Sequence, residues 1–214
     1  MAMNGGSLRC DAASMGAHRH ICAFFNGPEE EHRVLGAFYQ DGFERGEKVT
    51  HIVAAEHRDE YLQRLAAAGT DVQKLTGTGQ LQVLRWANMY AQEHRFDQDT
   101  MLVSAERLIK SCAADGYART KLVGHHLDWL FRDPAAVKNL VEYEARLNGL
   151  LENYEVPVVC VYDSSKFGAS VALDIMRTHP LVIIGGLLRQ NPFFIPPEQF
   201  LDEMRERGAS QTES

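Results

Sequence analysis

The chain has no hydrophobic run long enough to cross a membrane and no excess of positive charge. A membrane-spanning helix needs about 20 mainly apolar residues in a row, and no apolar run in the 214 residues approaches that length. The formal net charge is −7, whereas non-specific nucleic-acid binding depends on lysine and arginine facing phosphates. The N-terminus also lacks a charged segment followed by an apolar one, as a signal peptide would have. We therefore expect no membrane insertion, no secretion and no direct nucleic-acid binding.

Motifs for disulfides and for nucleophilic catalysis are also missing. The four cysteines, Cys10, Cys22, Cys112 and Cys160, form no C-x-x-C pair, and most lie in apolar segments where a free cysteine packs as a small hydrophobic residue. This usage predicts a cytoplasmic protein without a disulfide framework. No serine or cysteine lies in a motif such as G-x-S-x-G, and no pair of acids suited to acid–base catalysis is identifiable. We therefore expect a protein that is not an enzyme.

A phosphate-binding loop is missing although the scaffold that usually carries one is present. The apolar run Ile21 to Phe25 predicts a buried strand, residues 29 to 45 have apolar side chains at helical spacing, and residues 49 to 53 predict a second strand. In nucleotide-binding proteins the loop after such a first strand reads G-x-x-x-x-G-K-[ST]. Here Asn26 to Glu31 contains no lysine, serine or threonine, proline removes a backbone donor, and three glutamates would repel phosphate. ATP hydrolysis is therefore not expected.

Strand and helix patterns alternate along the whole chain. Further strands are predicted at residues 81–84, 121–124, 156–162 and 181–184, and further helices at 58–68, 100–115, 134–153, 169–177 and 196–207, with a glycine-rich loop at 76–79. Such alternation predicts an α/β three-layer sandwich with a mostly parallel central sheet. We expect one domain over residues 18–207, between disordered tails at 1–17 and 208–214.

Two resemblances emerge from short motifs. Phe38 to Val53 resembles the segment after the phosphate loop in RecA/KaiC-type ATPases. The whole chain resembles the MEDS family, the methanogen/methylotroph DcmR-type sensory domain. The matching motifs, in chain order, are His20 and Cys22, Gly42 with Gly46-Glu47, Gly79-Gln80-Leu81, Tyr90, Phe96-Asp97, Gly116-Tyr117, Trp129, Tyr143-Glu144 with Leu147-Asn148, Cys160-Val161-Tyr162-Asp163, His179-Pro180 and Asn191-Pro192-Phe193.

The MEDS resemblance implies a RecA/KaiC-like fold that lost its ATPase motif and became a sensor of small, often hydrocarbon-like molecules. Members are commonly fused to DNA-binding or histidine-kinase-like modules, but this chain shows neither. Where the family usually has Gly-Glu-Met before its tryptophan, this chain has Gly124-His125-His126. The family's usual pocket chemistry is therefore not carried over to these positions.

A ligand pocket is expected where the parallel strands end, because open α/β sheets bind ligands at their carboxyl edge. Aromatic surface with a few polar groups suits a small, mostly apolar molecule. The expected lining is Phe24, Phe25, Asn26, His125, His126, Trp129, Tyr162 and Asp163.

Several of these side chains have a second interpretation. His125 and His126 are candidate ligands for a metal or a haem, but adjacent residues of a strand point to opposite faces, so they would need a bulge to share one ion. Contact with a polar ligand and a purely structural role are the other interpretations of this pair. Asp163 either contacts a ligand or caps the turn that follows it.

Other polar residues are expected inside the fold. His20 and Cys22 alternate with Ile21 and are expected to pack inward, with a metal role as the weaker alternative. Glu144 lies on the inward face of its helix, and a buried glutamate needs a partner. His51 and His57 show no ligand spacing and are expected to be structural or exposed.

These observations together favour a non-catalytic sensor of a small organic molecule, with no cofactor. Its output in signal transduction or transcriptional regulation would pass through a separate regulator or kinase-like protein, and a homodimer is expected by analogy with RecA-like domains. The alternatives are a metal- or haem-binding sensor or enzyme using His125 and His126, and a degenerate nucleotide-binding scaffold.

Overall fold

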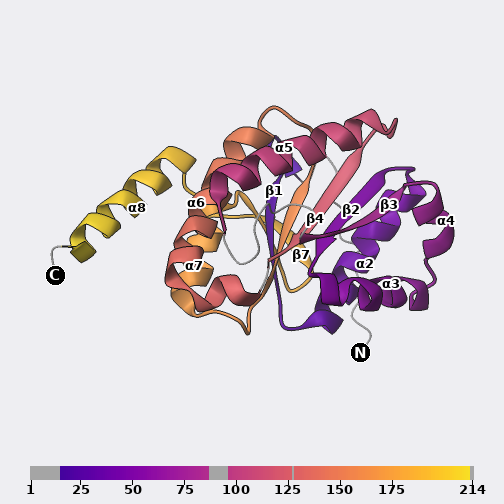
Figure 1. Cartoon of the computed structure of the whole chain (residues 1–214), viewed down its shortest axis with the longest axis horizontal. Helices are drawn as coiled ribbons and strands as arrows, with labels where there is room; N and C mark the ends of the chain where they lie inside the picture. Colours follow the sequence, from indigo (N-terminus) through magenta and orange to yellow (C-terminus); the bar gives the residue numbers. More distant parts are fainter. Residues whose placement is uncertain (1–14, 87–95, 127, 213–214) are drawn as a thin grey trace.

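The computed structural model describes residues 15–86, 96–126 and 128–212, and its centre is one seven-stranded sheet (Figure 1). The strand order is β3-β2-β4-β5-β1-β6-β7, and every neighbouring pair is parallel except β6 and β7. The strands are β1 (His20–Phe25), β2 (Lys48–Val53), β3 (Leu81–Arg85), β4 (Thr120–His125), β5 (Val158–Asp163), β6 (Leu181–Ile184) and β7 (Leu187–Gln190).

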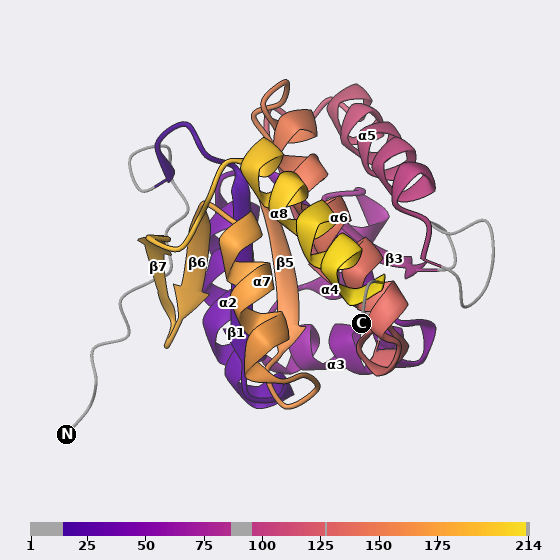
Figure 2. The same cartoon turned by 90° about the vertical axis from the view of Figure 1, so that its left-hand side faces the viewer.

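Helices cover both faces of this sheet and complete the three-layer sandwich that the sequence predicts. They are α2 (Pro28–Glu44), α3 (Arg58–Ala67), α4 (Val72–Gly77), α5 (Gln98–Ala114), α6 (Pro134–Leu151), α7 (Ala169–Thr178) and α8 (Pro197–Thr212), with short 3₁₀ helices η1 (Ala55–His57) and η3 (Asp128–Arg132). One hydrophobic core lies between the sheet and α2 and α3, and a second lies between the sheet and α5, α6, α7 and α8. Figure 2 shows α8 lying over α6 and α7, both of which it contacts.

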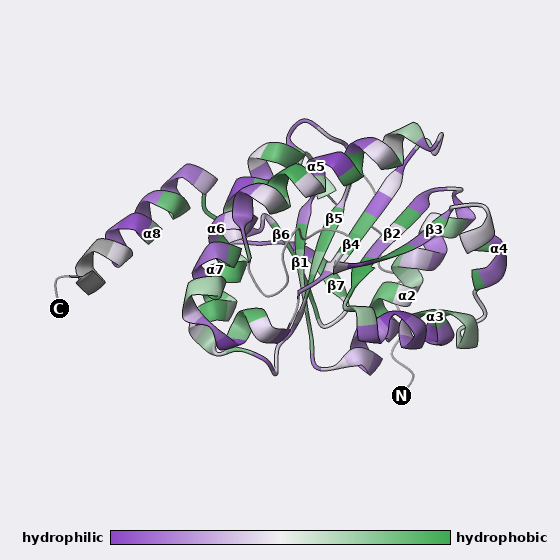
Figure 3. Cartoon of the chain, viewed as in Figure 1, coloured by the Kyte–Doolittle hydropathy of each residue, from purple (hydrophilic) through white to green (hydrophobic). Residues whose placement is uncertain are grey.

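The alternation of side chains in the central strands decides which residues meet in each core. In β1, Ile21, Ala23 and Phe25 belong to the core under α2, whereas Cys22 belongs to the core under α6. The parallel register pairs Cys22 with Cys160 of β5. Because paired residues of neighbouring strands point to the same face, this register collects polar groups of β1 and β5 on the side of α6. The apolar colouring of these strands in Figure 3 reflects their burial on both faces.

Helix α6 forms as its sequence predicts and brings a glutamate into the core. Asp133 caps its first turn by accepting a hydrogen bond from the Ala135 N–H at 2.9 Å, and Pro134 occupies the first helical position. Glu144 lies one turn beyond Leu140 on the buried face and is fully buried, as expected.

Several boundaries differ from the sequence-based expectation. A short strand, β7, follows the Gly185-Gly186 turn and was not predicted. The start of the expected loop at residues 76–79 is instead the last turn of α4, whose N-cap Asp71 accepts the Lys74 N–H. Helix α8 continues to Thr212, where we expected a disordered tail after residue 207, and its far end extends away from the sheet (Figure 1).

The expected N-terminal tail lies mostly outside the described residues, but its end does not. Met15 packs into the core under α2 with 5 % of its surface exposed. Cys10 and Tyr90 also lie outside the described residues. Among the helices that the structure describes, none combines the length and the hydropathy that a membrane span requires.

Candidate functional site: a buried carboxylate surrounded by histidines

The densest polar cluster of the described fold surrounds the carboxylate of Glu144 between the sheet and α6. The side chains around it come from β1, from β5, from the residue after β4 and from the residue after α7. They are His20, Cys160, Tyr162, His126 and His179, and the side chain of each is at most about 5 % exposed.

The two oxygens of Glu144 have different neighbours. Oε1 accepts a hydrogen bond from the Tyr162 hydroxyl at 2.8 Å and lies 3.0 Å from Nε2 of His126. Oε2 lies 3.1 Å from Nε2 of His20, 3.6 Å from Sγ of Cys160 and 3.6 Å from Nε2 of His179. Two histidine rings and a thiol therefore converge on the second oxygen.

Hydrogen bonds on the far side fix the orientation of two of these rings. The amide nitrogen of Asn148 donates to the backbone carbonyls of Glu144, Ala145 and Thr178. Its Oδ1 is therefore the atom that faces Nδ1 of His20 at 3.2 Å, and it accepts a hydrogen bond from that nitrogen. Nδ1 of His179 likewise faces the carbonyl of Ile175 at 2.8 Å. With Nδ1 as the donor in both rings, Nε2 is the atom that points to the cluster.

Burial and the carboxylate set the charges of the cluster. Burial by itself would raise the pKa of Glu144, but the adjacent rings of His126 and His20 hold it well below its ordinary value. Burial and then the charge of Glu144 raise the pKa values of the Tyr162 hydroxyl and the Cys160 thiol. Burial and then the nearby His20 lower the pKa of His179 to about 3. At neutral pH the site therefore contains a charged carboxylate, a protonated thiol and a neutral His179.

A second, smaller group lies on the opposite face of the sheet, beside the start of α2. Nε2 of His125 is 3.0 Å from Oε1 of Glu31, and the rings of His125 and His51 stack with centroids 4.7 Å apart. Burial, and then His125, lower the pKa of His51 well below its ordinary value. Within the described chain neither ring nitrogen of His51 has a hydrogen-bond partner. His51 is therefore buried rather than exposed, and its structural role stays a prediction.

The sheet divides the residues that we expected to line one pocket. Phe25 and His125 belong to the face of α2, whereas Phe24, His126 and Tyr162 face α6. The expectation of a single shared lining is therefore wrong, because consecutive strand residues point to opposite sides. The same alternation separates His125 from His126, so these two histidines do not form a common metal or haem site.

The remaining members of that set have local roles. Phe24 stacks on Tyr162 with ring centroids 5.6 Å apart. Trp129 lies in η3 and packs against the core under α6. Asn26 is exposed, and Asp163 accepts hydrogen bonds from the N–H and hydroxyl of Ser165, as the turn-capping alternative predicts. Ligand binding by these residues stays a prediction.

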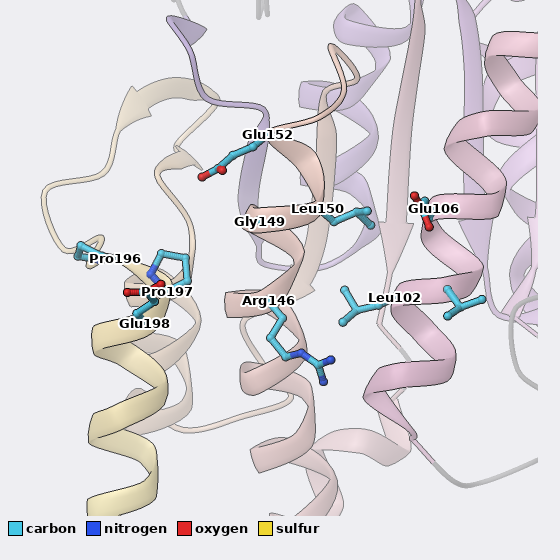
Figure 4. A pocket seen from close by; sticks show the side chains of 10 residues that line it. Leu102, Glu106, Arg146, Gly149, Leu150, Glu152, Pro196, Pro197 and Glu198 are labelled. Carbon is cyan, nitrogen blue, oxygen red and sulfur yellow. The ribbon is translucent and has the colours of Figure 1, made fainter.

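Two hollows lie on the side of α5 and α6. One is a small, almost wholly apolar cavity of about 40 Å³ between the sheet and these helices. It is lined by Ile52, Trp86, Met101, Ala105, Leu108, Ile109, Leu122, Gly124, His126, Tyr143, Leu147, Val158 and Cys160. The other is a surface groove of about 690 Å³ between α5, α6 and the start of α8, where Arg146, Glu106 and Glu198 add charge to an apolar floor (Figure 4). Of the residues expected from the sequence, His126 is the one that lines the apolar cavity.

The family model for MEDS, the MEthanogen/methylotroph, DcmR Sensory domain, matches residues 19–180. The chain belongs to the MEDS family. Its motif residues His20, Glu144, Asn148, Cys160 and Tyr162, although far apart in sequence, meet in the carboxylate cluster together with His179. The MEDS motifs therefore mark the polar centre of the fold.

Solved structures show the same fold as this MEDS domain at low sequence identity. A KaiC-like protein from the hyperthermophilic archaeon Pyrococcus horikoshii OT3 superposes with a TM-score of 0.56 and 16% identity, covering 77% of this chain and 71% of that one. An uncharacterised Pyrococcus horikoshii protein, solved in complex with an unknown peptide, has a TM-score of 0.58 and 10% identity, covering 77% and 76%. No curated protein matches the chain. The fold is therefore KaiC-like, and the family is sensory.

Proposed function

We propose that this MEDS domain senses a small, largely apolar organic molecule held between the sheet and helices α5 and α6. The observation that carries the proposal is the apolar cavity of about 40 Å³, with His126 as one polar group in its wall. One water-sized probe occupies roughly 10–15 Å³, so the cavity suits a molecule of only a few heavy atoms. Such a site, mainly apolar with few polar groups, is the usual form of a small-molecule pocket. The description of the family as a sensory domain supports the same function.

Two residues that line the cavity also belong to the cluster around Glu144. Its lining includes His126 and Cys160, and both also approach Glu144, at 3.0 Å and 3.6 Å. A molecule in the cavity would therefore act on a cluster that joins β1, β5 and α6. We propose that ligand binding changes the packing of β1, β5 and α6, and that a separate regulator or kinase-like protein in the cytoplasm binds the changed domain. The domain itself would act as a homodimer.

Gly124→Ala is expected to weaken ligand binding while stabilising the protein. Gly124 lines the cavity and pairs with Cys160 in the sheet, so a methyl group there points to the same side as the Cys160 thiol. Apart from the glycine and its two chain neighbours, no described residue has an atom within 4 Å of that methyl position. Removing a glycine from a strand adds about 0.5–1 kcal/mol to the free energy of unfolding. Thermal shift with a panel of one- to four-carbon hydrocarbons, alcohols and halocarbons would measure both effects.

A matched control for this variant is Gly36→Ala in α2, on the other face of the sheet. Its added methyl also meets no described atom within 4 Å, and alanine is favoured over glycine in a helix by about 1 kcal/mol. Both variants should raise the melting temperature without ligand, but only Gly124→Ala should reduce the shift that a bound compound produces. Equal ligand shifts in the wild type and both variants would place the binding site elsewhere.

We also propose that the domain does not hydrolyse ATP. At the position of a phosphate loop, the Asn26 N–H donates to the Glu30 carboxylate at 2.9 Å, and Glu31 pairs with His125. The Glu30 carboxylate thus takes a backbone N–H that a phosphate oxygen would need. The loop from Asn26 to Glu31 also contains no lysine, serine or threonine to hold phosphate and Mg²⁺. Phosphate release with MgATP should equal the buffer blank, for the wild type and for Glu30→Lys. Magnesium-dependent release that persists through repeated purification and is lost in Glu30→Lys would contradict this proposal.

A further inference from the structure

We propose that His20, His179, Cys160 and Glu144 together bind one divalent transition-metal ion, with zinc as the best match. The ligand atoms would be Nε2 of both histidines, Sγ of the cysteine and Oε2 of the glutamate, which lie within 4.8 Å of one another. The site shares Cys160 with the lining of the apolar cavity, but metal binding is measured without any organic ligand, so it can fail or succeed independently of the proposed sensing.

Four of the six separations between these atoms are close to those of a tetrahedral site, and all six are within 4.8 Å. Metal–ligand bonds of about 2.0–2.3 Å in a tetrahedron place the ligand atoms roughly 3.3–3.6 Å apart. The structure gives 3.1 Å from His20 to Glu144, 3.5 Å from His20 to Cys160, and 3.6 Å from Cys160 to Glu144. His179 to Glu144 is also 3.6 Å. Small adjustments would therefore bring His20, Cys160 and Glu144 to bonding distance of one central ion, and a movement of the His179 ring would complete the set.

Hydrogen bonding leaves Nε2 of His179 directed at the site without a partner. Nδ1 of His179 donates to the Ile175 carbonyl, so Nε2 of the neutral ring presents a lone pair. That atom is fully buried and has no hydrogen-bond partner within the described fold. A cationic His20 would pair with Glu144, but it would still leave Nε2 of His179 unsatisfied. A metal ion satisfies both rings together.

The groups behind the ligands resemble the outer shell of a metal site. Asn148 and the Ile175 carbonyl orient the two imidazoles, and the Tyr162 hydroxyl occupies Oε1 of Glu144, which leaves Oε2 for the ion. Metal-bound histidines usually donate their other nitrogen in this way. A divalent ion with one carboxylate and one thiolate also forms a neutral unit, which suits complete burial.

The choice of atoms indicates the class of metal. Imidazole and thiolate ligands select zinc or a related transition metal, whereas calcium and magnesium prefer oxygen. His125 and Glu31 on the other face of the sheet are not part of this site. The ligands come from β1, α6, β5 and the residue after α7, so the site forms only in the folded chain.

The test uses the full chain, freed of metal with a chelator and then titrated with Co²⁺ or Zn²⁺. We expect one equivalent of metal to bind, measured by elemental analysis, and Co²⁺ to give the absorption bands of a tetrahedral site with a thiolate ligand. Cys160→Ser should abolish the sulfur-to-cobalt band. The matched control is Cys112→Ser, which alters another buried free cysteine outside the cluster and should leave the spectrum unchanged.

A second variant keeps the test decisive if Cys160→Ser fails to fold. His179→Gln removes one ligand and should lower zinc affinity by more than the roughly 10–100-fold that loss of an outer-shell partner causes. Absence of stoichiometric binding to the wild type would overturn the proposal. So would cobalt bands or zinc affinity that are equal in the wild type and in folded Cys160→Ser or His179→Gln.

Discussion

Glu144→Ala is expected to lower the free energy of unfolding by about 3–5 kcal/mol, the usual loss when one partner of a buried ion pair is removed. The carboxylate is fully buried, accepts the Tyr162 hydroxyl at 2.8 Å and lies 3.1 Å from His20. Truncation leaves the Tyr162 hydroxyl without its acceptor inside the protein, where an unsatisfied group costs about 1–3 kcal/mol, and it removes the carboxylate beside His20. Urea denaturation followed by circular dichroism would measure the loss.

The matched control is Glu152→Ala at the C-terminal end of the same helix. Glu152 is exposed, and exposed substitutions usually change stability by no more than about 0.5 kcal/mol. A loss below about 1 kcal/mol in Glu144→Ala, equal to that of the control, would show that the cluster does not hold the two layers together.

Lys121→Ala is expected to destabilise the protein by a similar 3–5 kcal/mol. The side chain of Lys121 is 4 % exposed and points from β4 toward α2. Its ammonium lies 3.2 Å from Asp41 and 3.1 Å from Glu47, and it sits over the ring of Phe38 at 4.4 Å. In Lys121→Ala the largely buried carboxylate of Glu47 has no cation beside it. This unpaired charge is the main reason for the expected decrease in the free energy of unfolding.

Two comparisons test this explanation. Lys110→Ala breaks an exposed i,i+4 pair with Glu106 on α5 and should leave the stability almost unchanged, because solvent screens exposed pairs. In the double variant Lys121→Met with Glu47→Gln, much of the loss should be recovered, because no unpaired charge remains. If the loss in the double variant equals the sum of the losses in Lys121→Met and Glu47→Gln alone, the ion pair is not the cause.

The layers of this fold are predictable from sequence because local patterns determine them. The apolar runs of β1 and β5 and the Asp133-Pro134 start of α6 mark elements that lie where they are expected. The antiparallel β7 was missed because its apolar residues are few, although the Gly185-Gly186 pair before it is a hairpin signal. The extension of α8 was missed because residues 208–212 are small or polar and show no apolar spacing, although the helix continues through them to Thr212.

The site was predictable only in part because it depends on register between distant strands. The burial of His20 and the need of Glu144 for a partner follow from local spacing, and both are observed. That these two residues are partners follows from β1 lying beside β5 and under α6, which no local pattern reveals. The contact of His179 with the same carboxylate depends on the third strand in that row, β6. Family motifs pointed to these residues individually but not to their meeting point.

The place of β1 in the sheet has a consequence for biosynthesis. The strand lies between β5 and β6, and His20 pairs with Val158. Roughly 140 further residues must leave the ribosome before this neighbour exists, which takes roughly 7–28 s at about 5–20 residues per second. During that interval the most apolar early segment of the nascent chain has neither of its final neighbours. Translation products that stop before Val158 should therefore be the forms that aggregate or recruit chaperones.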